Sequence, residues 1–218
     1  FVALQHLPVA DAIAIAFVLP FMMLFLGWLV LGETIGPHRI IACLVGFIGT
    51  LLVIQPNLVE AGYYALLPLL GALIFAVFIL ATRSVAKEIG AVELQAVSGL
   101  LACLIILPVL LAAYTFGFLP QALEVRSVDL TTGGLLLALG LIGTCAHLLM
   151  TWSLRFAPSA TLAPMQYIEI PIATFFGWLI FSDLPDGLAA VGIMVTVCAG
   201  LYIIMREHRL AKAAAKLA

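Results

Sequence analysis

Charged residues are scarce in this sequence of 218 residues, since Asp, Glu, Lys and Arg together make up only 9% of it. Soluble domains carry about 25% charged residues, so the composition excludes an ordinary soluble protein. Hydrophobic residues reach 65%, and the mean hydropathy is +1.28. Because a backbone inside lipid must satisfy its own hydrogen bonds, we expect an all-α protein that crosses a bilayer several times.

Signatures of several other protein classes are also missing. The net charge is -2, and no cluster of Lys and Arg indicates nucleic-acid binding. The sequence has no G-x-S-x-G or H-E-x-x-H motif and no paired aspartates within an apolar run. The cysteines lie in apolar runs without metal-ligand spacing, and we expect them to be buried: Cys43, Cys103, Cys145 and Cys198. We therefore expect no enzymatic activity, no metal, no cofactor and no nucleic-acid partner.

Apolar runs divide the chain into seven predicted membrane spans, because a bilayer core takes roughly 20 residues of helix. The predicted spans are Ala10 to Leu31, Ile40 to Ile54, Tyr63 to Thr82, Leu94 to Phe116, Leu130 to Trp152, Ala160 to Phe181 and Leu188 to Met205. The second span is short, and we expect it to gain a turn from its flanks.

The positions of Lys and Arg predict the orientation of these spans, because basic residues in short loops stay on the cytoplasmic side. With the N-terminus outside, the inside segments contain Arg39, Arg83, Lys87, Arg155, Arg206, Arg209, Lys212 and Lys216. Only Arg126 then falls outside. The basic tail, residues 206–218, is therefore predicted to be cytoplasmic.

The sequence contains an internal repeat, in which residues 3–33 align with residues 153–183 without a gap. Pro8 meets Pro158, the triplet Gly-Trp-Leu recurs at matched positions, and an acidic residue ends both segments. The offset of 150 residues contains five predicted spans. An odd number of spans makes the two copies cross the membrane in opposite directions, an arrangement typical of secondary transporters.

The repeat also predicts how the chain is organised. Residues 57–205 would form a complete repeat of five helices, whereas residues 1–56 would hold only the last part of the first repeat. The second copy begins near Tyr63, and subtracting the offset of 150 residues places the start of the first copy before residue 1. On the order of 80 to 90 residues are therefore predicted to be missing from the N-terminus. The sequence lacks an initiator Met and a signal peptide. We therefore expect a truncated chain with seven complete helices out of ten.

Two stretches carry a resemblance to a known family. They are LPVADAIAIAFVLPFMMLFLGWLVLGE, residues 7–33, and its second copy APSATLAPMQYIEIPIATFFGWLIFSD, residues 157–183. They resemble the EamA-type members of the drug/metabolite transporter superfamily, which are ten-helix proteins with two inverted five-helix repeats. The resemblance implies a bacterial inner-membrane protein that moves a small metabolite, such as an amino acid, a nucleotide or S-adenosylmethionine. It leaves open whether the protein forms a homodimer.

Glu169 is the residue that most strongly indicates a functional site, because it lies about ten residues, or roughly 15 Å, inside its predicted span. Carboxylates at such a depth usually face a cavity or a partner and mark a substrate or ion path. On a continuous helix, Gln166, Glu169, Ala173 and Gly177 would share one face. Gln166 and the neighbouring Tyr167 carry hydrogen-bonding groups and are further candidates for this cavity.

The preceding span carries a comparable stripe of Gly140, Thr144, His147 and Thr151. We expect His147 and Glu169 at similar depths in antiparallel helices. In one interpretation the two side chains only neutralise each other. In the other, Glu169 binds a cationic or amine-bearing substrate, or takes up a proton that couples transport to the proton gradient. The predicted substrate-binding residues are Glu169, Gln166, Tyr167, His147 and Thr144.

Three further predictions concern local geometry. Pro20 and Pro171 are expected to interrupt matched helices. Asp11 is expected to be a solvated acid at the outer end of the first span. Four glycines are expected to allow close approach of helices: Gly46, Gly49, Gly192 and Gly200.

The predicted function is secondary transport of a small polar metabolite by alternating access, with proton coupling as an option. The alternative is a seven-helix receptor or another membrane protein without transport activity, since seven spans with an external N-terminus match that layout. A retinal protein is disfavoured because the last span contains no Lys. A receptor also gives no reason for an inverted repeat. The sequence leaves open the substrate, the direction and the coupling ion.

Overall fold

The computed structural model describes residues 2–56, 62–117, 129–182 and 187–215, and every regular element in these ranges is a helix. In chain order the elements are η1 (Val2–Gln5), α1 (Val9–Ala16), α2 (Leu19–Leu31), α3 (Pro37–Ile54), η2 (Gly62–Ala65), α5 (Leu66–Val85), α6 (Ala91–Thr115), α7 (Leu130–Phe156), α8 (Ser159–Leu162), η4 (Ala163–Ile168), α9 (Glu169–Phe181) and α10 (Gly187–Ala215). Six of the described segments are long and apolar enough to span a membrane, with α1 and α2 taken as one segment and η2 and α5 as another.

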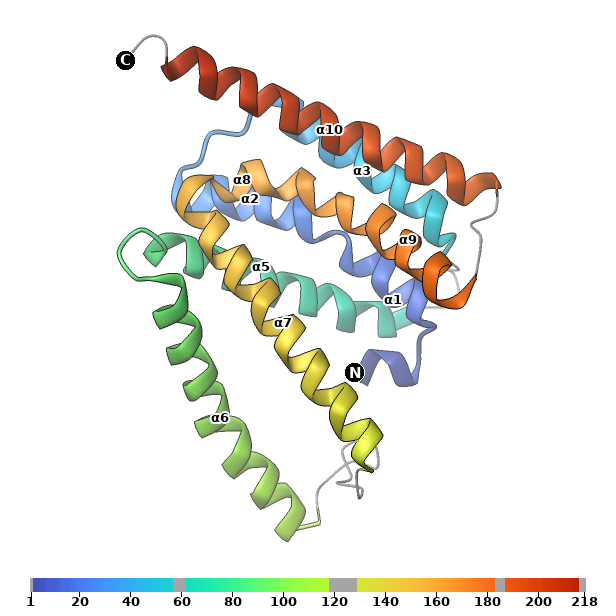
Figure 1. Ribbon diagram of the computed structural model, residues 1–218, viewed down its shortest axis with the longest axis vertical. Helices are drawn as coiled ribbons and strands as arrows, with labels where there is room; N and C mark the ends of the chain where they lie inside the picture. The colour runs from blue at the N-terminus through green and yellow to red at the C-terminus, as the bar shows by residue number, and fades with distance from the viewer. Residues whose placement is uncertain (1, 57–61, 118–128, 183–186, 216–218) are drawn as a thin grey trace. The chain divides into compact units, whose positions relative to one another are not determined.

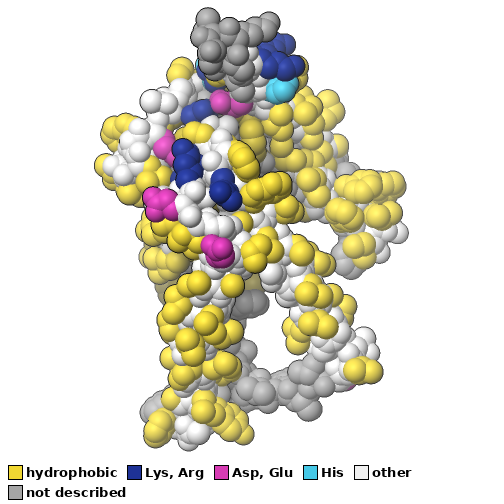
Figure 2. Space-filling model, turned by 60° about the vertical axis from the view of Figure 1, so that its left-hand side comes forward, with side chains coloured by type: hydrophobic (Ala, Val, Ile, Leu, Met, Phe, Trp, Pro, Cys, Tyr) yellow, Lys and Arg dark blue, Asp and Glu magenta, His cyan; other side chains and the backbone are white. Residues whose placement is uncertain are grey.

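The surface of these helices agrees with a membrane protein. Hydrophobic side chains cover most of the face seen in Figure 2. The short second span gains the expected turn, because α3 begins at Pro37. The predicted burial of cysteines holds only for Cys43, since Cys103, Cys145 and Cys198 are exposed. On helices that face lipid, such exposed thiols lie among other apolar side chains.

The first span is interrupted near its middle, between α1 and α2 (Figure 1). Pro20 is the second residue of α2 and has no amide hydrogen to donate to the carbonyl of Ala16. The Phe21 amide donates to the Val18 carbonyl at 3.0 Å, rather than to the Phe17 carbonyl as a continuous helix would require. The interruption therefore releases carbonyl groups inside the span, and each of them needs another donor.

The sixth predicted span, Ala160 to Phe181, is not one continuous α-helix. It consists of the single turn α8, the 3-10 segment η4 and the helix α9. Pro164 lies at the start of η4, and Pro171 lies in the first turn of α9, where a missing amide hydrogen is tolerated. Gln166 belongs to η4 whereas Glu169 begins α9, so the expectation of one continuous α-helix through both residues is wrong.

Helix boundaries recur at the offset of 150 residues. α2 matches α9 residue for residue, and each is followed by a residue in the left-handed region, Gly32 at φ 63° and Ser182 at φ 60°. α1 and α8 both begin directly after the matched prolines, and α3 and α10 begin at the matched positions 37 and 187. Asp183, the predicted acidic end of the second copy, lies outside the described residues. The repeat found in the sequence is therefore also present in the backbone.

α3 and α10 lie side by side and run antiparallel (Figure 1). Gly192, near the start of α10, faces Gly49 in the second half of α3, and a Cβ atom on Gly192 would lie 2.6 Å from the Gly49 carbonyl oxygen. Gly46 and Gly200 lie similarly close to side chains of η4. The prediction that these four glycines permit close packing is confirmed.

The described chain forms two compact units. The first contains residues 1–84 and 157–218, and the second contains residues 85–156. The first unit holds the interrupted spans together with α3, α5 and α10. In the second unit the start of α6 lies against the end of α7, and no residue of α6 is buried.

Candidate functional site

The two interrupted spans meet at their interruptions. The Tyr167 hydroxyl of η4 donates a hydrogen bond of 3.2 Å to the Phe17 carbonyl, and the two ring centroids are 5.9 Å apart. That carbonyl is one of those released between α1 and α2. Phe17 and Tyr167 are matched positions of the repeat, separated by 150 residues. A residue contacts its own counterpart in this way when a local two-fold axis passes between the two copies.

Tyr167 and Gln166 are held by different neighbours within the first unit. Tyr167 is fully buried, and its ring packs against Gly46 of α3. Its contacts are therefore structural, and binding of substrate by Tyr167 stays a prediction. Gln166 is half-buried, and its Nε2 donates to the Met23 sulfur at 3.0 Å. Because a thioether is a weak acceptor, the Gln166 amide remains able to bind a better partner.

Glu169 is exposed within the first unit, and it is the first residue of α9. Among the described residues of the first unit, none forms a hydrogen bond or ion pair with its carboxylate. The positive end of the α9 dipole favours an anion at this position. A carboxylate in the middle of a span with this setting can bind a cation, an amine or a proton.

His147 and Thr144 lie on α7 in the second unit, whereas the other three predicted residues lie in the first unit. The Thr144 hydroxyl donates to the Gly140 carbonyl at 2.8 Å, a bond inside its own helix. His147 is half-buried. The predicted pairing of His147 with Glu169 stays a prediction.

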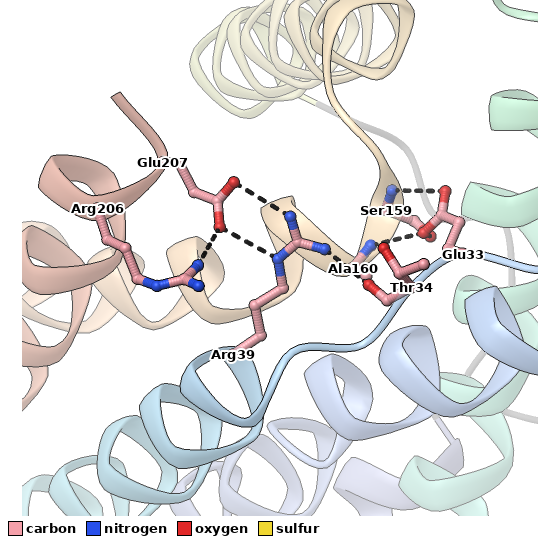
Figure 3. A network of polar contacts seen from close by, with 7 residues as sticks. All are labelled: Glu33, Thr34, Arg39, Ser159, Ala160, Arg206 and Glu207. Atoms are coloured by element: carbon pink, nitrogen blue, oxygen red, sulfur yellow. Dashed lines mark hydrogen bonds and ion pairs between the residues drawn. The ribbon is translucent and has the colours of Figure 1, made fainter. Parts of the chain in front are cut away.

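A second polar site, which the sequence analysis did not predict, lies where α2 ends. The Glu33 carboxylate accepts hydrogen bonds from the Ser159 amide at 3.0 Å, the Ser159 hydroxyl at 2.7 Å and the Ala160 amide at 2.9 Å (Figure 3). It therefore caps the start of α8. The Arg83 Nε of α5 lies 3.6 Å from the same carboxylate, whose side chain is only 9% exposed. A charge with so little exposure depends on its partners.

A neighbouring ion pair joins α3 to α10 at the same end. The Arg39 guanidinium donates to both Glu207 carboxylate oxygens, at 3.2 and 3.1 Å, and to the Thr34 carbonyl at 2.9 Å (Figure 3). Arg206 donates to Glu207 at 3.1 Å. We call this group the polar cluster; its members are Glu33, Thr34, Arg39, Ser159, Ala160, Arg206 and Glu207.

The sequence contains a signal for the polar cluster beyond the acidic end of a helix at Glu33 and the topology-setting charge of Arg39. A helix start directly after Pro158 offers unpaired amide groups, which a carboxylate satisfies well. The sequence alone did not identify which carboxylate reaches that helix start.

Asp11 is placed differently from its predicted setting. It lies in the first turn of α1, as expected, but it is only 3% exposed. The prediction of a solvated acid is therefore wrong. A buried carboxylate needs a partner, and Asp11 has one in the structure.

Open pockets lie in both units. A pocket of the first unit has a volume of about 470 Å³ and lies beside Glu33, Thr34 and Trp28. A pocket of the second unit has a volume of about 390 Å³ and lies between α6 and α7, beside Trp152 and Arg155. A further pocket of the second unit, of about 330 Å³, lies along α6 beside Leu107, Leu111 and Tyr114. None of these three is lined by a predicted substrate-binding residue.

Comparison with known proteins gives a family match over most of the chain. The EamA-like transporter family matches residues 1–55 and 62–206. A riboflavin transporter of Rhizobium johnstonii is 28% identical over 94% of this chain and 65% of its own length. A pseudopaline exporter of Pseudomonas aeruginosa is 28% identical over 92% of this chain and 68% of its own. An S-adenosylmethionine uptake transporter of Rickettsia prowazekii is 24% identical over 93% of this chain and 65% of its own length.

These matches bear on the expected class and on the length of the chain. The family is one of transporters, so the prediction of a non-enzymatic membrane protein is confirmed. The chain spans less than two thirds of the riboflavin transporter that it matches. A crystal structure of a protein with 21% identity has the same fold, with a TM-score of 0.68 over 95% of this chain and 71% of the other.

Proposed function

Because the chain belongs to the EamA-like transporter family, we propose that the complete protein moves a small polar metabolite across the membrane by alternating access. The observation that carries this proposal is the meeting of two interrupted spans at Phe17 and Tyr167. Interrupted helices that meet near the middle of the membrane form the substrate site in many secondary transporters. Glu169 and Gln166 lie within three residues of that meeting point.

The proposed architecture is an inverted repeat of two five-helix units. Residues 1–56 form the end of the first unit, and residues 57–205 form the second. The matched helix boundaries and the antiparallel packing of α3 against α10 support opposite directions for the two copies. A complete protein of ten helices stays the prediction.

We assign the end that carries the polar cluster to the cytoplasm. Contacts at this end join five segments: the end of α2, the start of α3, the end of α5, the start of α8 and the C-terminal part of α10. Spans that alternate in direction across the membrane place these five segments on the same side. Arg39, Arg83 and Arg206 lie at this end, and basic residues favour the cytoplasmic side. The relatives are bacterial, so the proposed location is the bacterial inner membrane. Formation of a homodimer stays a prediction.

A cationic or amine-bearing substrate fits Glu169 best. Among the solutes in the relatives' names, S-adenosylmethionine carries a sulfonium and an amine, whereas riboflavin is uncharged at neutral pH. A mid-span carboxylate that has no partner among the described residues of its own unit favours the first of these chemistries. Uptake of a proton by Glu169, which would couple transport to the proton gradient, is the second role that its setting allows. Since the relatives include both an exporter and an uptake protein, we propose no direction.

The test is transport by the complete protein in liposomes, with labelled S-adenosylmethionine and labelled riboflavin as probes. Glu169→Gln keeps the shape of the side chain but removes its charge, and we expect the transport rate to fall at least about tenfold, the effect of losing one charge-assisted contact. Glu88→Gln, which neutralises an exposed carboxylate, is the matched control and should retain the wild-type rate. A Glu169→Gln protein with the wild-type rate and pH dependence would exclude the carboxylate from the mechanism.

A further inference from the structure

We propose that the polar cluster is a gate that closes the cytoplasmic end of the transport path, and that its bonds must break before this end opens. The proposal rests on the proposed function, because it concerns the closed and open states of an alternating-access cycle. It assigns a role in that cycle to Glu33, Arg39 and Glu207, which lie outside the substrate site.

The bonds of the cluster connect the two parts of the chain that alternating access would separate. Glu33 and Arg39 precede residue 57, whereas their partners Ser159, Ala160 and Glu207 follow it. Five hydrogen bonds of the cluster cross between these parts, three to the Glu33 carboxylate and two from the Arg39 guanidinium. A rocking movement that opens this end would have to break all five.

The charges of the cluster are shielded from solvent. The Glu33 side chain is 9% exposed, that of Arg39 14% and that of Glu207 19%. Charge-assisted hydrogen bonds are stronger than neutral ones, and breaking a shielded pair leaves each charge without its partner until water reaches it. These contacts therefore favour the state in which the end is closed.

Two side chains at the cluster end have no polar counterpart in the repeat. Leu188 and Ala189 occupy the positions matched to His38 and Arg39, so the second copy carries neither charge nor ring there. At the cluster end, His38 Nδ1 and the Tyr202 hydroxyl lie 2.6 Å apart and add a further hydrogen bond. Because the contacts of the cluster hold this end closed, weakening them should shift the protein toward the state open to the cytoplasm.

Glu33 also connects the gate to the proposed substrate site. Its carboxylate fixes the start of α8, and the chain then runs through η4 directly to Gln166, Tyr167 and Glu169. Release of Ser159 by Glu33 would free the cytoplasmic half of this interrupted span. The same carboxylate would then control both the opening of the end and the position of the span that carries Glu169.

The experiment measures how accessible two reporter cysteines are in the complete protein, in a background without native cysteines. Leu162→Cys, in α8, reports on the cytoplasmic side, and Ile15→Cys, in α1, reports on the outer side; both native residues are half-buried. A membrane-impermeant thiol reagent is added to right-side-out or inside-out vesicles. Glu33→Gln and Arg39→Gln should each raise the labelling rate at Leu162→Cys about tenfold and lower that at Ile15→Cys, because one charge-assisted hydrogen bond corresponds to about a factor of ten in an equilibrium.

Three comparisons make the result decisive. Glu88→Gln is the charge-matched control and should leave both rates unchanged. Arg39→Gln combined with Glu207→Gln should have no more effect than either change alone, because both break the same pair. If Glu33→Gln fails to fold, the Arg39 and Glu207 variants decide alone. If the wild type transports, the gate is refuted by unchanged labelling rates in the variants. An equal rise in the labelling rates at Leu162→Cys and Ile15→Cys would refute it as well. Failure of the wild type to transport would instead count against the proposed function.

Discussion

Substitution of Gly192 by Ala tests the packing of α3 against α10. The added Cβ would lie 2.6 Å from the Gly49 carbonyl oxygen, 2.8 Å from the Val53 Cγ2 and 2.9 Å from the Leu52 Cβ. Because the nearest of these atoms belongs to the backbone, the two helices must move apart, and such overpacking costs about 1–3 kcal/mol. Gly71→Ala, in α5, is the matched control, since nothing lies within 4 Å of its Cβ position.

Both variants gain similar helix propensity, about 1 kcal/mol, so this term cancels when they are compared. The free energy of unfolding of Gly192→Ala should therefore be about 1–3 kcal/mol below that of Gly71→Ala. Reversible unfolding in mixtures of a mild detergent and sodium dodecyl sulfate measures this difference. Equal stability of the two variants would mean that α3 and α10 do not pack closely in the membrane.

Three further predictions concern other parts of the chain. Tyr167→Phe leaves the Phe17 carbonyl without its donor, and it should lower the free energy of unfolding by about 0.5–1.5 kcal/mol in the same assay; an unchanged value would contradict the bond. Hydrogen bonding to Thr132 lowers the pKa of Asp129 at the start of α7, so its stabilising effect is present above the usual carboxyl pKa and lost as pH falls through the lowered pKa. As pH falls through the lowered pKa of Asp129, amide hydrogen exchange in the first turn of α7 should accelerate relative to the intrinsic exchange rate in the wild type. Asp129→Asn should show no such acceleration. For topology, a cysteine at Gly187 should react only from outside and one at Glu88 only from the cytoplasm; the reverse pattern would refute the orientation.

Much of the fold was predictable because apolar length and repeat matching are properties of the sequence itself. Six of the seven predicted spans correspond to long apolar helical segments, whereas Ala160 to Phe181 is divided into shorter helices. The repeat offset also locates the ends of α2 and α9. The glycines of α3 and α10 were predictable for a similar reason, since small residues at helical spacing permit close approach in a membrane.

The site was less predictable because it depends on where the helices are interrupted. The sequence indicated interruptions at Pro20 and Pro171, but not that the chain before Pro171 would form a 3-10 segment. This segment separates Gln166 from the α-helix that Glu169 begins, and it brings Tyr167 under the Phe17 carbonyl. Contacts between residues 150 positions apart arise from tertiary packing, which local patterns do not encode.

The two copies of the repeat share a backbone arrangement but differ in their side-chain chemistry. In both copies the α-helix resumes at matched residues, Leu19 and Glu169, after the interruption, yet the side chains at the interruptions differ. Gln166, Tyr167 and Glu169 are matched in the first copy by residues 16, 17 and 19, which are Ala, Phe and Leu. The single hydroxyl of Tyr167 reaches the first copy's released carbonyl, where the matched phenylalanine has nothing to donate. Polar groups therefore accumulate on one copy around a shared backbone arrangement. Under the proposed function, this asymmetry would give a substrate polar contacts from the second copy and apolar contacts from the first.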